Sequence, residues 1–418
     1  MLLGLNDRRP PRDVDVAIAG LGPVGATAAL TLARAGLRVA VFEEAGWDTL
    51  TDQDVSESRA STFHPPTLEI LDDLGVTDEL HEAGLVCDTF QYRDREGGLI
   101  AHFDLASIGA DTRFPYRLQS EQQNLVRIIG ARLAELPDVH LVHGARVRSV
   151  DRSAGDDAAT LLVEPADGEG EPVVCRAKWV IAADGAHSAI RRHLGIPFPG
   201  MTYPEQFLVV STTDDLAELI PDIASVNYIS DPREWLVLLR TPRHWRALFP
   251  LLERDVEGAL DPAAVQRRLQ SVAPLPRGYE ITHSRIYRVH QRVAERFRVG
   301  RVLLAGDAAH INNPLGGMGM NSGIHDAAAA AAAILAAEAG DPEPIERYES
   351  ERRTVAHDYV RVVTHENWEA LQEEDPAERV RQNEHMRRTA ADPELARAHL
   401  LRTSMLSARV SQTAGGRS

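Results

Sequence analysis

The chain has 418 residues, of which 44% are hydrophobic and 26% charged, and its formal net charge is −17. This length supports two or three structural units, and the negative charge argues against nucleic acid or an anionic membrane as partner. With only Cys87 and Cys175, and no Cys/His ligand spacing, neither a disulfide framework nor a metal site is expected. The first 13 residues do not resemble a signal peptide and no apolar run reaches membrane-span length, so the cytoplasm is the expected location.

A glycine fingerprint follows the first predicted strand. Residues 14–19 are an apolar run typical of a buried parallel strand, and Gly20, Gly22 and Gly25 come directly after it. A helix is predicted over 26–35. Gly20 permits a tight turn, Gly22 lets the backbone approach a pyrophosphate, and Gly25 lets helix and strand pack closely. In this context the pattern predicts a dinucleotide site at the helix N-terminus.

A second strand, predicted over 38–42, ends in Glu43 and Glu44. A carboxylate at this place can accept hydrogen bonds from a ribose diol. It would also repel a 2′-phosphate, so the site suits FAD or NAD better than NADP.

The rest of the chain predicts a mixture of strands and helices. Further helices are predicted over 67–74, 120–136, 263–269 and 322–337, with a charged helical tail from 344 to about 407. Further strands are predicted over 86–92, 99–103, 139–142, 160–163, 179–183, 207–211, 224–229, 235–239, 246–250, 281–289 and 301–305.

Two of these strands end in short motifs. Residues 179–183 lead into Asp184-Gly185, and residues 301–305 lead into Gly306-Asp307. Carboxyl ends of parallel strands are where α/β sheets bind ligands, although an aspartate there also suits a helix N-cap. Glycines at 316, 317 and 319 then leave room for the backbone to approach a flat ring before the next helix.

These motifs, in this order, resemble those of the FAD-dependent aromatic hydroxylases, single-component (group A) flavoprotein monooxygenases related to para-hydroxybenzoate hydroxylase. The resemblance covers residues 13–355 and includes the run from His187 to Arg191 and the run from His310 to Asn321. It implies an α/β fold: a Rossmann-like FAD-binding domain of the glutathione-reductase type, an inserted β-rich substrate domain and a C-terminal helical segment. The expected bounds are 13–85, 105–200 and 292–345 for the FAD-binding domain, 86–104 and 201–291 for the substrate domain, and 346–418 for the helical segment.

The resemblance and the fingerprint together predict the FAD-binding residues. They are Gly20, Gly22, Pro23, Val24, Gly25, Glu43, Glu44, Arg59, Gln119, Asp184, Gly306, Asp307, Pro314, Gly317, Gly319, Met320 and Asn321. Arg59 is expected near the diphosphate, and Gln119 and Asp307 at the ribityl chain. Plainer interpretations remain for each: a surface arginine, a polar residue flanking a helix, and a helix cap.

The family's chemistry implies that NADH or NADPH reduces FAD and that O₂ then forms a C4a-hydroperoxide, which hydroxylates a phenolic or heteroaromatic ring. No second glycine fingerprint exists, so the nicotinamide is expected to bind transiently. Two catalytic positions carry over: Pro314, whose carbonyl lines the oxygenation site, and Tyr228, which contacts the phenol unless it is plain core. Asn313 replaces a proline of many relatives and could alter the loop or donate to a substrate.

The polar residues that hold the benzoate carboxylate in para-hydroxybenzoate hydroxylase align with Leu239 and Thr241, which argues against a benzoate held in the same way. Arg240 and Arg246 could anchor an acid, but charges on the strand surface are the simpler interpretation.

Other functions stay open at this point. A flavin reductase or dehydrogenase, or a Baeyer–Villiger oxygenase, would share these motifs, because they report the cofactor and not the substrate. A non-catalytic flavin sensor is a further alternative. A halogenase is disfavoured because the Trp-x-Trp-x-Ile-Pro run is absent and the only lysine, Lys178, is badly placed. A monomer or homodimer is expected, and the choice between NADH and NADPH is open.

Overall fold

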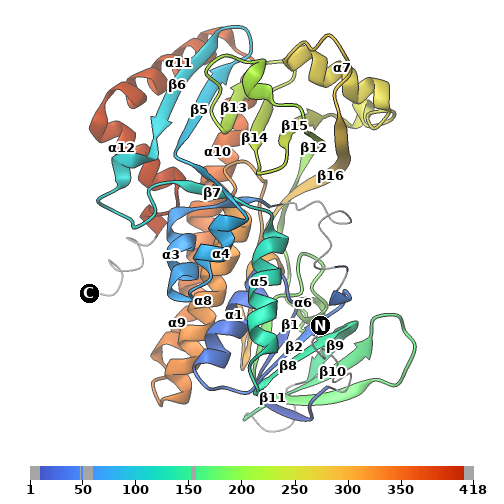
Figure 1. Cartoon of the computed structure of the whole chain (residues 1–418). Helices are drawn as coiled ribbons and strands as arrows, with labels where there is room; N and C mark the ends of the chain where they lie inside the picture. Colours follow the sequence, from blue (N-terminus) through green and yellow to red (C-terminus); the bar gives the residue numbers. More distant parts are fainter. Residues whose placement is uncertain (1–9, 48, 50–59, 152–156, 409–418) are drawn as a thin grey trace.

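The computed structural model describes residues 10–47, 49, 60–151 and 157–408 (Figure 1). Arg59 lies outside these residues, as does most of the polar stretch after Glu44. The described part has two units, each built on an eight-stranded sheet. A small three-stranded sheet lies where the two units meet.

The first sheet has a parallel core of five apolar strands in the order β18-β11-β1-β2-β8. They are β1 (Asp13–Ala19), β2 (Val39–Glu43), β8 (Val139–His143), β11 (Val173–Ala182) and β18 (Val302–Leu304). The strands β9 (Ala145–Asp151), β10 (Ala159–Pro165) and β17 (Arg298–Val299) extend it by antiparallel pairing. Because the core strands are parallel, their carboxyl ends share one edge.

Helices cover this sheet along one side in Figure 1. They are α1 (Pro23–Arg34), α5 (Gln122–Ala134), α8 (Met318–Glu338) and α9 (Glu343–Thr354), together with the shorter α3 (Pro65–Asp73) and α4 (Thr77–Glu82). The short helix α6 (Ala189–His193) lies apart from this group. The alanine-rich faces of α1 and α8 pack against each other, which lets the two helices come close.

The second sheet has the order β19-β16-β12-β15-β14-β13-β5-β6 and is antiparallel except between β13 and β5. Its strands are β5 (Thr89–Asp94), β6 (Gly98–Asp104), β12 (Gly200–Thr212), β13 (Val226–Ser230), β14 (Leu236–Arg240), β15 (Trp245–Leu251), β16 (Ile281–Val293) and β19 (His310–Ile311). Helix α7 (Pro262–Val272) packs Val265 and Leu269 into the core on one face.

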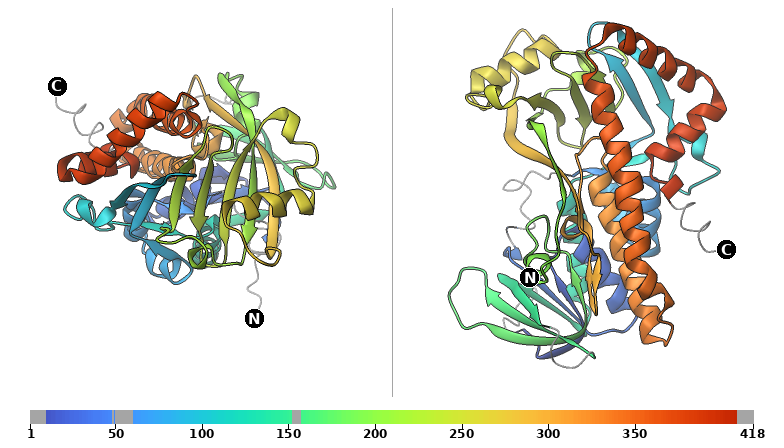
Figure 2. Two further views of the ribbon diagram at one scale, coloured as in Figure 1. Left: turned by 90° about the horizontal axis from the view of Figure 1, so that it is seen from above. Right: turned by 180° about the vertical axis from the view of Figure 1, so that it is seen from behind.

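The C-terminal helices cover the other face of the second sheet. They are a π-helical turn (Val355–Val360), α10 (Arg361–Gln372), α11 (Pro376–Ala391) and α12 (Pro393–Thr403). Figure 2 shows them running up from the first unit and folding over β5 and β6. Leu371, Ala396 and Leu400 are buried in the same core as the sheet residues Phe90 and Tyr228, so the charged tail completes this core.

The predicted α/β fold with its β-rich unit and helical segment is confirmed. Strand β9 and helix α4 were not predicted, since each is short and polar outside its buried positions. Helix α8 begins at Met318, earlier than predicted, because Gly317 adopts a left-handed conformation and ends the loop there. The predicted domain bounds stay a prediction. They assign residues 86–104 to the substrate domain, and β5 and β6, which lie within this range, belong to the second sheet.

Candidate active site

The ends of β1, β2, β11 and β18 bring the distant motifs together. The Gly20 N–H donates to the Phe42 carbonyl at 2.8 Å, and the Ala183 N–H donates to the Ala19 carbonyl at 2.9 Å. The Ala305 N–H donates to the Ala182 carbonyl at 3.0 Å. The glycine fingerprint, Asp184-Gly185 and Gly306-Asp307 therefore lie side by side at one edge of the parallel sheet.

The three fingerprint glycines have different surroundings. Gly20 has φ +95°, and a Cβ there would lie 2.4 Å from the Ala183 carbonyl oxygen. A Cβ on Gly25 would lie 2.0 Å from the Gly20 oxygen. A Cβ on Gly22 would meet nothing within 4 Å, so space stays open in front of this residue. Gly20 and Gly25 are required by packing, whereas Gly22 faces the space that a diphosphate would fill.

The N-terminus of α1 is available to an anion. Gly22 is its N-cap and supplies no side chain to cap the helix, and Pro23 stands at the first turn. The N–H groups of such a turn have no partner within the helix and carry the positive end of its dipole. Together with the open space at Gly22, this turn fits the pyrophosphate of a dinucleotide.

Glu43 is fixed beside this turn. Its carboxylate accepts hydrogen bonds from the Leu21 N–H at 2.7 Å and the Ala45 N–H at 2.8 Å, which orients it next to the fingerprint. Carboxylate oxygens keep further lone pairs for a ribose diol. Glu44 is exposed and forms an ion pair with Arg146.

Two predicted residues carry buried polar atoms without a hydrogen-bond partner. The Gln119 Oε1 accepts from the Thr62 hydroxyl at 3.0 Å, but its Nε2 has no partner. The Asp184 Oδ2 accepts from the Ala189 N–H at 2.7 Å, but its Oδ1 has none, and burial raises the pKa of this carboxyl group. A hydroxyl-rich ligand chain would satisfy both atoms, so these residues fit the ribityl diphosphate of FAD.

The Gly306-Asp307 turn is fixed by Asp326, a residue that was not predicted from the sequence. Asp326 of α8 is fully buried and accepts from the Gly306 N–H at 3.0 Å, from His310 Nε2 at 2.7 Å and from Arg352 Nε at 2.7 Å. Burial opposes its ionisation, but the charges of Arg352 and His310 lower the pKa of Asp326 below its usual value. The one feature of the sequence that could have indicated this role is an aspartate next to an alanine-rich helical run.

Val24 joins this turn to the fingerprint. A Cβ on Gly306 or on Gly323 would lie 2.7 Å from a Val24 methyl group. The predicted residue Val24 therefore packs α1 against the turn and α8, and Asp307 is exposed at the edge where α1 begins.

The loop before α8 forms a second uncapped helix N-terminus. Gly317 is its N-cap at φ +66°, supplies no side-chain cap, and donates its N–H to the Pro314 carbonyl at 2.9 Å. Gly319 and Met320 lie half-buried in the first helical turn. Asn321 is buried: its amide donates to the Thr62 carbonyl at 2.7 Å and accepts from the His64 N–H at 2.9 Å. In this structure Asn321 holds β3 (Thr62–Phe63) against the helix.

Asn313 anchors the same loop to the C-terminal helices. Its side-chain NH₂ donates to the Tyr203 hydroxyl at 3.0 Å and to the Thr364 carbonyl at 2.8 Å, and its oxygen accepts from the Leu315 N–H at 2.9 Å. Both amide hydrogens are used, so the idea that Asn313 donates to a substrate is wrong. The alternative, that it shapes the loop, agrees with the structure.

Aromatic residues of the second sheet face this loop. Tyr228 is 6% exposed and stacks on Tyr92 with ring centroids 5.4 Å apart, while Phe90 meets both rings edge to face. Leu315 belongs to the same apolar cluster. Phe90, Tyr92 and Tyr228, which we call the aromatic wall, therefore adjoin the loop before α8. A flavin and its aromatic substrate require such an arrangement.

The two arginines weighed as acid anchors have other partners. Arg246 is buried, contrary to the expectation of a surface charge, and both oxygens of Glu121 lie 2.8 Å from its Nη2. Arg240 is half-buried and pairs with Asp215. Arg246 escaped prediction because it sits beside Trp245 on a strand whose residues are nearly all buried.

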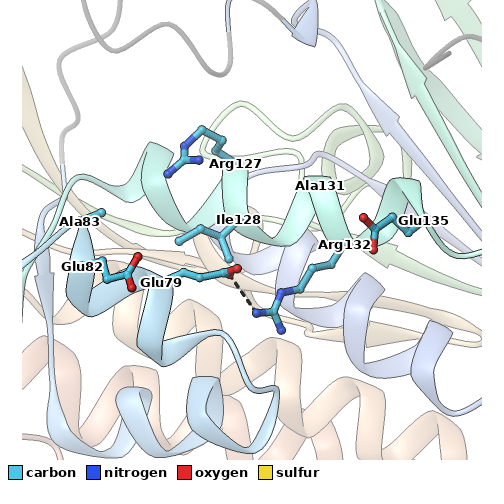
Figure 3. Close-up of a pocket in the computed structure, with 8 residues that line it drawn as sticks. All are labelled: Glu79, Glu82, Ala83, Arg127, Ile128, Ala131, Arg132 and Glu135. Atoms are coloured by element: carbon cyan, nitrogen blue, oxygen red, sulfur yellow. Dashed lines mark hydrogen bonds and ion pairs between the residues drawn. The ribbon is translucent and has the colours of Figure 1, made fainter. Parts of the chain in front are cut away.

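A cavity of about 550 Å³ lies apart from these residues, between α4 and α5. Figure 3 shows its lining, with the ion pair of Glu79 and Arg132 across it. It is lined by Glu79, Glu82, Ala83, Arg127, Ile128, Ala131, Arg132 and Glu135. None of them is a predicted site residue, and the mixed charges do not suit a flavin ring.

No described helix has the length and apolar character needed to cross a membrane. In the same residues, no three His, Cys, Asp or Glu side chains are grouped so that they could hold a metal ion.

Comparison with known proteins agrees with the geometry. Residues 13–363 match the family model described as the FAD binding domain. Para-nitrophenol 4-monooxygenase of Pseudomonas sp. strain WBC-3 is 33% identical over 406 residues, which are 94% of this chain and 96% of that protein. 6-Hydroxy-3-succinoylpyridine 3-monooxygenase of Pseudomonas putida is 31% identical, over 87% of this chain and 90% of that protein.

A solved structure shows the same similarity in three dimensions. The crystal structure of p-nitrophenol 4-monooxygenase from Pseudomonas putida DLL-E4 superposes with a TM-score of 0.85 at 32% identity. The similarity covers 94% of this chain and 98% of that one. The chain therefore belongs to the FAD-dependent aromatic hydroxylases, a family of flavoprotein monooxygenases.

Proposed function

We propose that this protein hydroxylates a small phenol or hydroxylated heteroaromatic ring, consuming NADH or NADPH and O₂. The observation that carries this proposal is the meeting of two uncapped helix N-termini with an aromatic wall. The first, at Gly22, suits a diphosphate, and the second, at Gly317, adjoins the wall through Leu315. A dinucleotide spanning from one to the other would bring its ring to the aromatic wall.

We assign roles to the predicted residues on this basis. The first turn of α1 binds the diphosphate, Glu43 binds the adenosine ribose, and Gln119 and Asp307 bind the ribityl chain. The turn at Gly317 would hold the pyrimidine end of the flavin ring, and the dipole of α8 would stabilise negative charge there. Bound FAD supplies the redox chemistry and activates O₂.

The remaining task of the protein is to orient the substrate and exclude water. Tyr228 and its aromatic neighbours offer ring faces for stacking. The loop from Pro314 to Gly317 adjoins these rings through Leu315 and would place the substrate beside the flavin. Leu239, where a benzoate-holding relative has a polar residue, lies against the apolar cluster, which supports a substrate other than a simple benzoate. The names of the two relatives, a nitrophenol and a hydroxypyridine monooxygenase, support hydroxylated rings with a second substituent.

The proposal is tested with the purified yellow protein. NADH and NADPH oxidation are measured with and without a panel of phenols and hydroxypyridines, and the products are identified by mass. Substrate-stimulated oxidation and a product heavier by one oxygen support hydroxylation. Oxidation without an oxygenated product, for every compound, would favour a reductase, and stoichiometric FAD without turnover would favour a sensor.

We further place the protein in the cytoplasm, as a monomer or homodimer. The two cysteines, Cys87 and Cys175, are buried and unpaired, which supports a reducing compartment. Fractionation of the source cells and the mass of the purified protein in solution test these two points.

A further inference from the structure

Arg117 differs from the other buried arginines of the described chain. It is 2% exposed, yet its Nε has no hydrogen-bond partner and its Nη2 reaches only the Thr403 carbonyl, at 3.5 Å. Arg246 and Arg352 each pair with a carboxylate, and Arg191 donates to two carbonyls at 2.8 and 2.9 Å. A buried cation without a carboxylate is unfavourable, so a ligand that supplied a negative charge at Arg117 would be bound favourably.

Arg117 lies near the residues that we assign to the flavin and substrate sites. It begins β7 (Arg117–Gln119), which lies where the two units meet in Figure 1. Alternation along a strand puts Arg117 on the same face as Gln119, the predicted ribityl contact. The neighbouring ring of His64 contacts the Gly316 carbonyl, in the loop before α8, at 2.8 Å.

The surroundings of Arg117 are aromatic, and among the described residues no carboxylate forms an ion pair with it. Its guanidinium lies 4.3 Å from the centroid of the Phe90 ring. His399 of α12 stacks on Phe103 at 4.5 Å and lies 5.8 Å from the Tyr92 ring. Burial, followed by the charge of Arg117, lowers the pKa of His64 to about 3 and that of His399 to about 4, so both rings are neutral.

We propose that Arg117 binds the negatively charged oxygen of an aromatic substrate whose ring lies against Phe90, Tyr92 and Tyr228. This rests on the proposed function and names its substrate class: an aromatic anion, either a phenolate or a ring carboxylate. A planar guanidinium with free N–H groups suits both oxyanions, and binding at a buried cation favours the ionised form of an acidic phenol.

The test compares charged and neutral ligands on the FAD-loaded protein, without NAD(P)H. Binding is followed by the change in flavin absorbance for two pairs: 4-nitrophenol with 4-nitroanisole, and 3-hydroxybenzoate with 3-hydroxybenzamide. Wild-type protein should bind the charged member of at least one pair more tightly, and the pair that discriminates identifies phenolate or carboxylate. Arg117→Met should weaken that ligand about tenfold to a hundredfold and leave its neutral analogue within about threefold.

Two further variants separate charge recognition from damage. Arg117→Lys keeps the charge and should fall between wild type and Arg117→Met. Arg240→Met, at a half-buried arginine paired with Asp215, should bind all four ligands as wild type does. Since Arg117 has no carboxylate partner, Arg117→Met should unfold at the same temperature as wild type or higher.

Equal weakening of charged and neutral ligands, no weakening, or a marked loss of thermal stability with FAD would overturn the role of Arg117. Hydroxylation of a neutral ring by an Arg117→Met variant that binds normally would leave the hydroxylase function standing without it. Failure of the wild-type protein to oxygenate any aromatic would instead count against the proposed function.

Discussion

The cofactor side and the substrate side of this molecule recognise their ligands by different means. On the cofactor side, the proposed contacts are backbone N–H groups at Gly22 and Gly317, where glycines leave room for a close approach. On the substrate side, the proposed contacts are side chains from β5, β7, β13 and α12, and Arg117 and His399 are far apart in sequence. Backbone recognition leaves local motifs in a sequence, whereas recognition by assembled side chains does not.

The largest effect is expected at Gly25. Gly25→Ala places a methyl group 2.0 Å from the Gly20 carbonyl oxygen, so α1 must move away from β1. The variant should lose FAD binding by at least about a hundredfold, and it should purify colourless or not fold. The flavin content per protein, measured by absorbance, checks this.

Gly22→Ala is the matched control, because its new methyl group meets no protein atom within 4 Å. It should fold as wild type does when FAD is absent and should bind FAD more weakly only because the methyl group occupies ligand space. If Gly25→Ala retains FAD better than Gly22→Ala, the contrast between packing and ligand contact is wrong.

The next effect is expected at Asp326, which supports the cofactor side from within the core. Asp326→Asn leaves the cation of Arg352 buried without its counter-charge, which should reduce the free energy of unfolding by about 3–5 kcal/mol. Urea unfolding measures it. Glu343→Gln breaks the exposed helical pair with Arg347 and should cost less than about 0.5 kcal/mol. Similar losses in the two variants would show that Asp326 is not a buried anchor.

Asn313 ties the loop before α8, on the cofactor side, to Tyr203 of β12 and Thr364 of α10. Its removal should therefore reduce the coupling between NAD(P)H consumption and hydroxylation. Asn313→Ala leaves the Leu315 N–H and the Thr364 carbonyl without their partner and should destabilise the protein by about 1–3 kcal/mol. With the loop loosened, a larger share of the NAD(P)H consumed should yield hydrogen peroxide instead of hydroxylated product. Assays of peroxide and product measure this share.

Asn367→Ala is the milder comparison, because Asn367 makes a long hydrogen bond of 3.4 Å to the Leu315 carbonyl. It should change the share of peroxide less than Asn313→Ala does. The reverse order would mean that α10, and not the Asn313 anchor, positions the loop.

The last effect, a dependence of stability on pH, is expected at His64. In the unfolded chain its pKa is near 6.5, and in the folded protein burial lowers this pKa to about 3. Between these values only the unfolded state binds the proton, so stability falls as pH falls, by at most about 1.4 kcal/mol per pH unit. His64→Gln should flatten this part of the pH–stability curve, measured by urea unfolding from pH 7 to pH 4. An unchanged slope would place its source in His399 or elsewhere.

The sequence predicted FAD as the cofactor and the α/β fold that would bind it, because the rules for such a site are local. Strand, glycine turn, helix and acidic residue follow one another from Val14 to Glu43, and each fixes the backbone of the next. Asp326 was missed because a buried aspartate in a helix reveals its role only when its partners, His310 and Arg352, come from other segments.

Beyond Tyr228, the substrate side could not be predicted, for a related reason. The family resemblance points to Tyr228 alone, the aromatic residues of β5 carry no motif, and the charged tail predicts helices without indicating what they cover. Their meeting depends on the parallel pairing of β13 with β5 and on the packing of α12 over both strands, which no spacing in the sequence encodes. Arg117 carried one local signal, its alternation with Gln119, which becomes informative once both side chains are known to be buried.

The fate of labelled oxygen decides whether this protein is a hydroxylase. The purified protein is supplied with NADH or NADPH, the phenol that stimulates oxidation most, and ¹⁸O₂. A hydroxylase should form a product that carries one ¹⁸O atom, in proportion to the NAD(P)H consumed. Oxidation of NAD(P)H with all of the label in hydrogen peroxide and none in an aromatic product would contradict it.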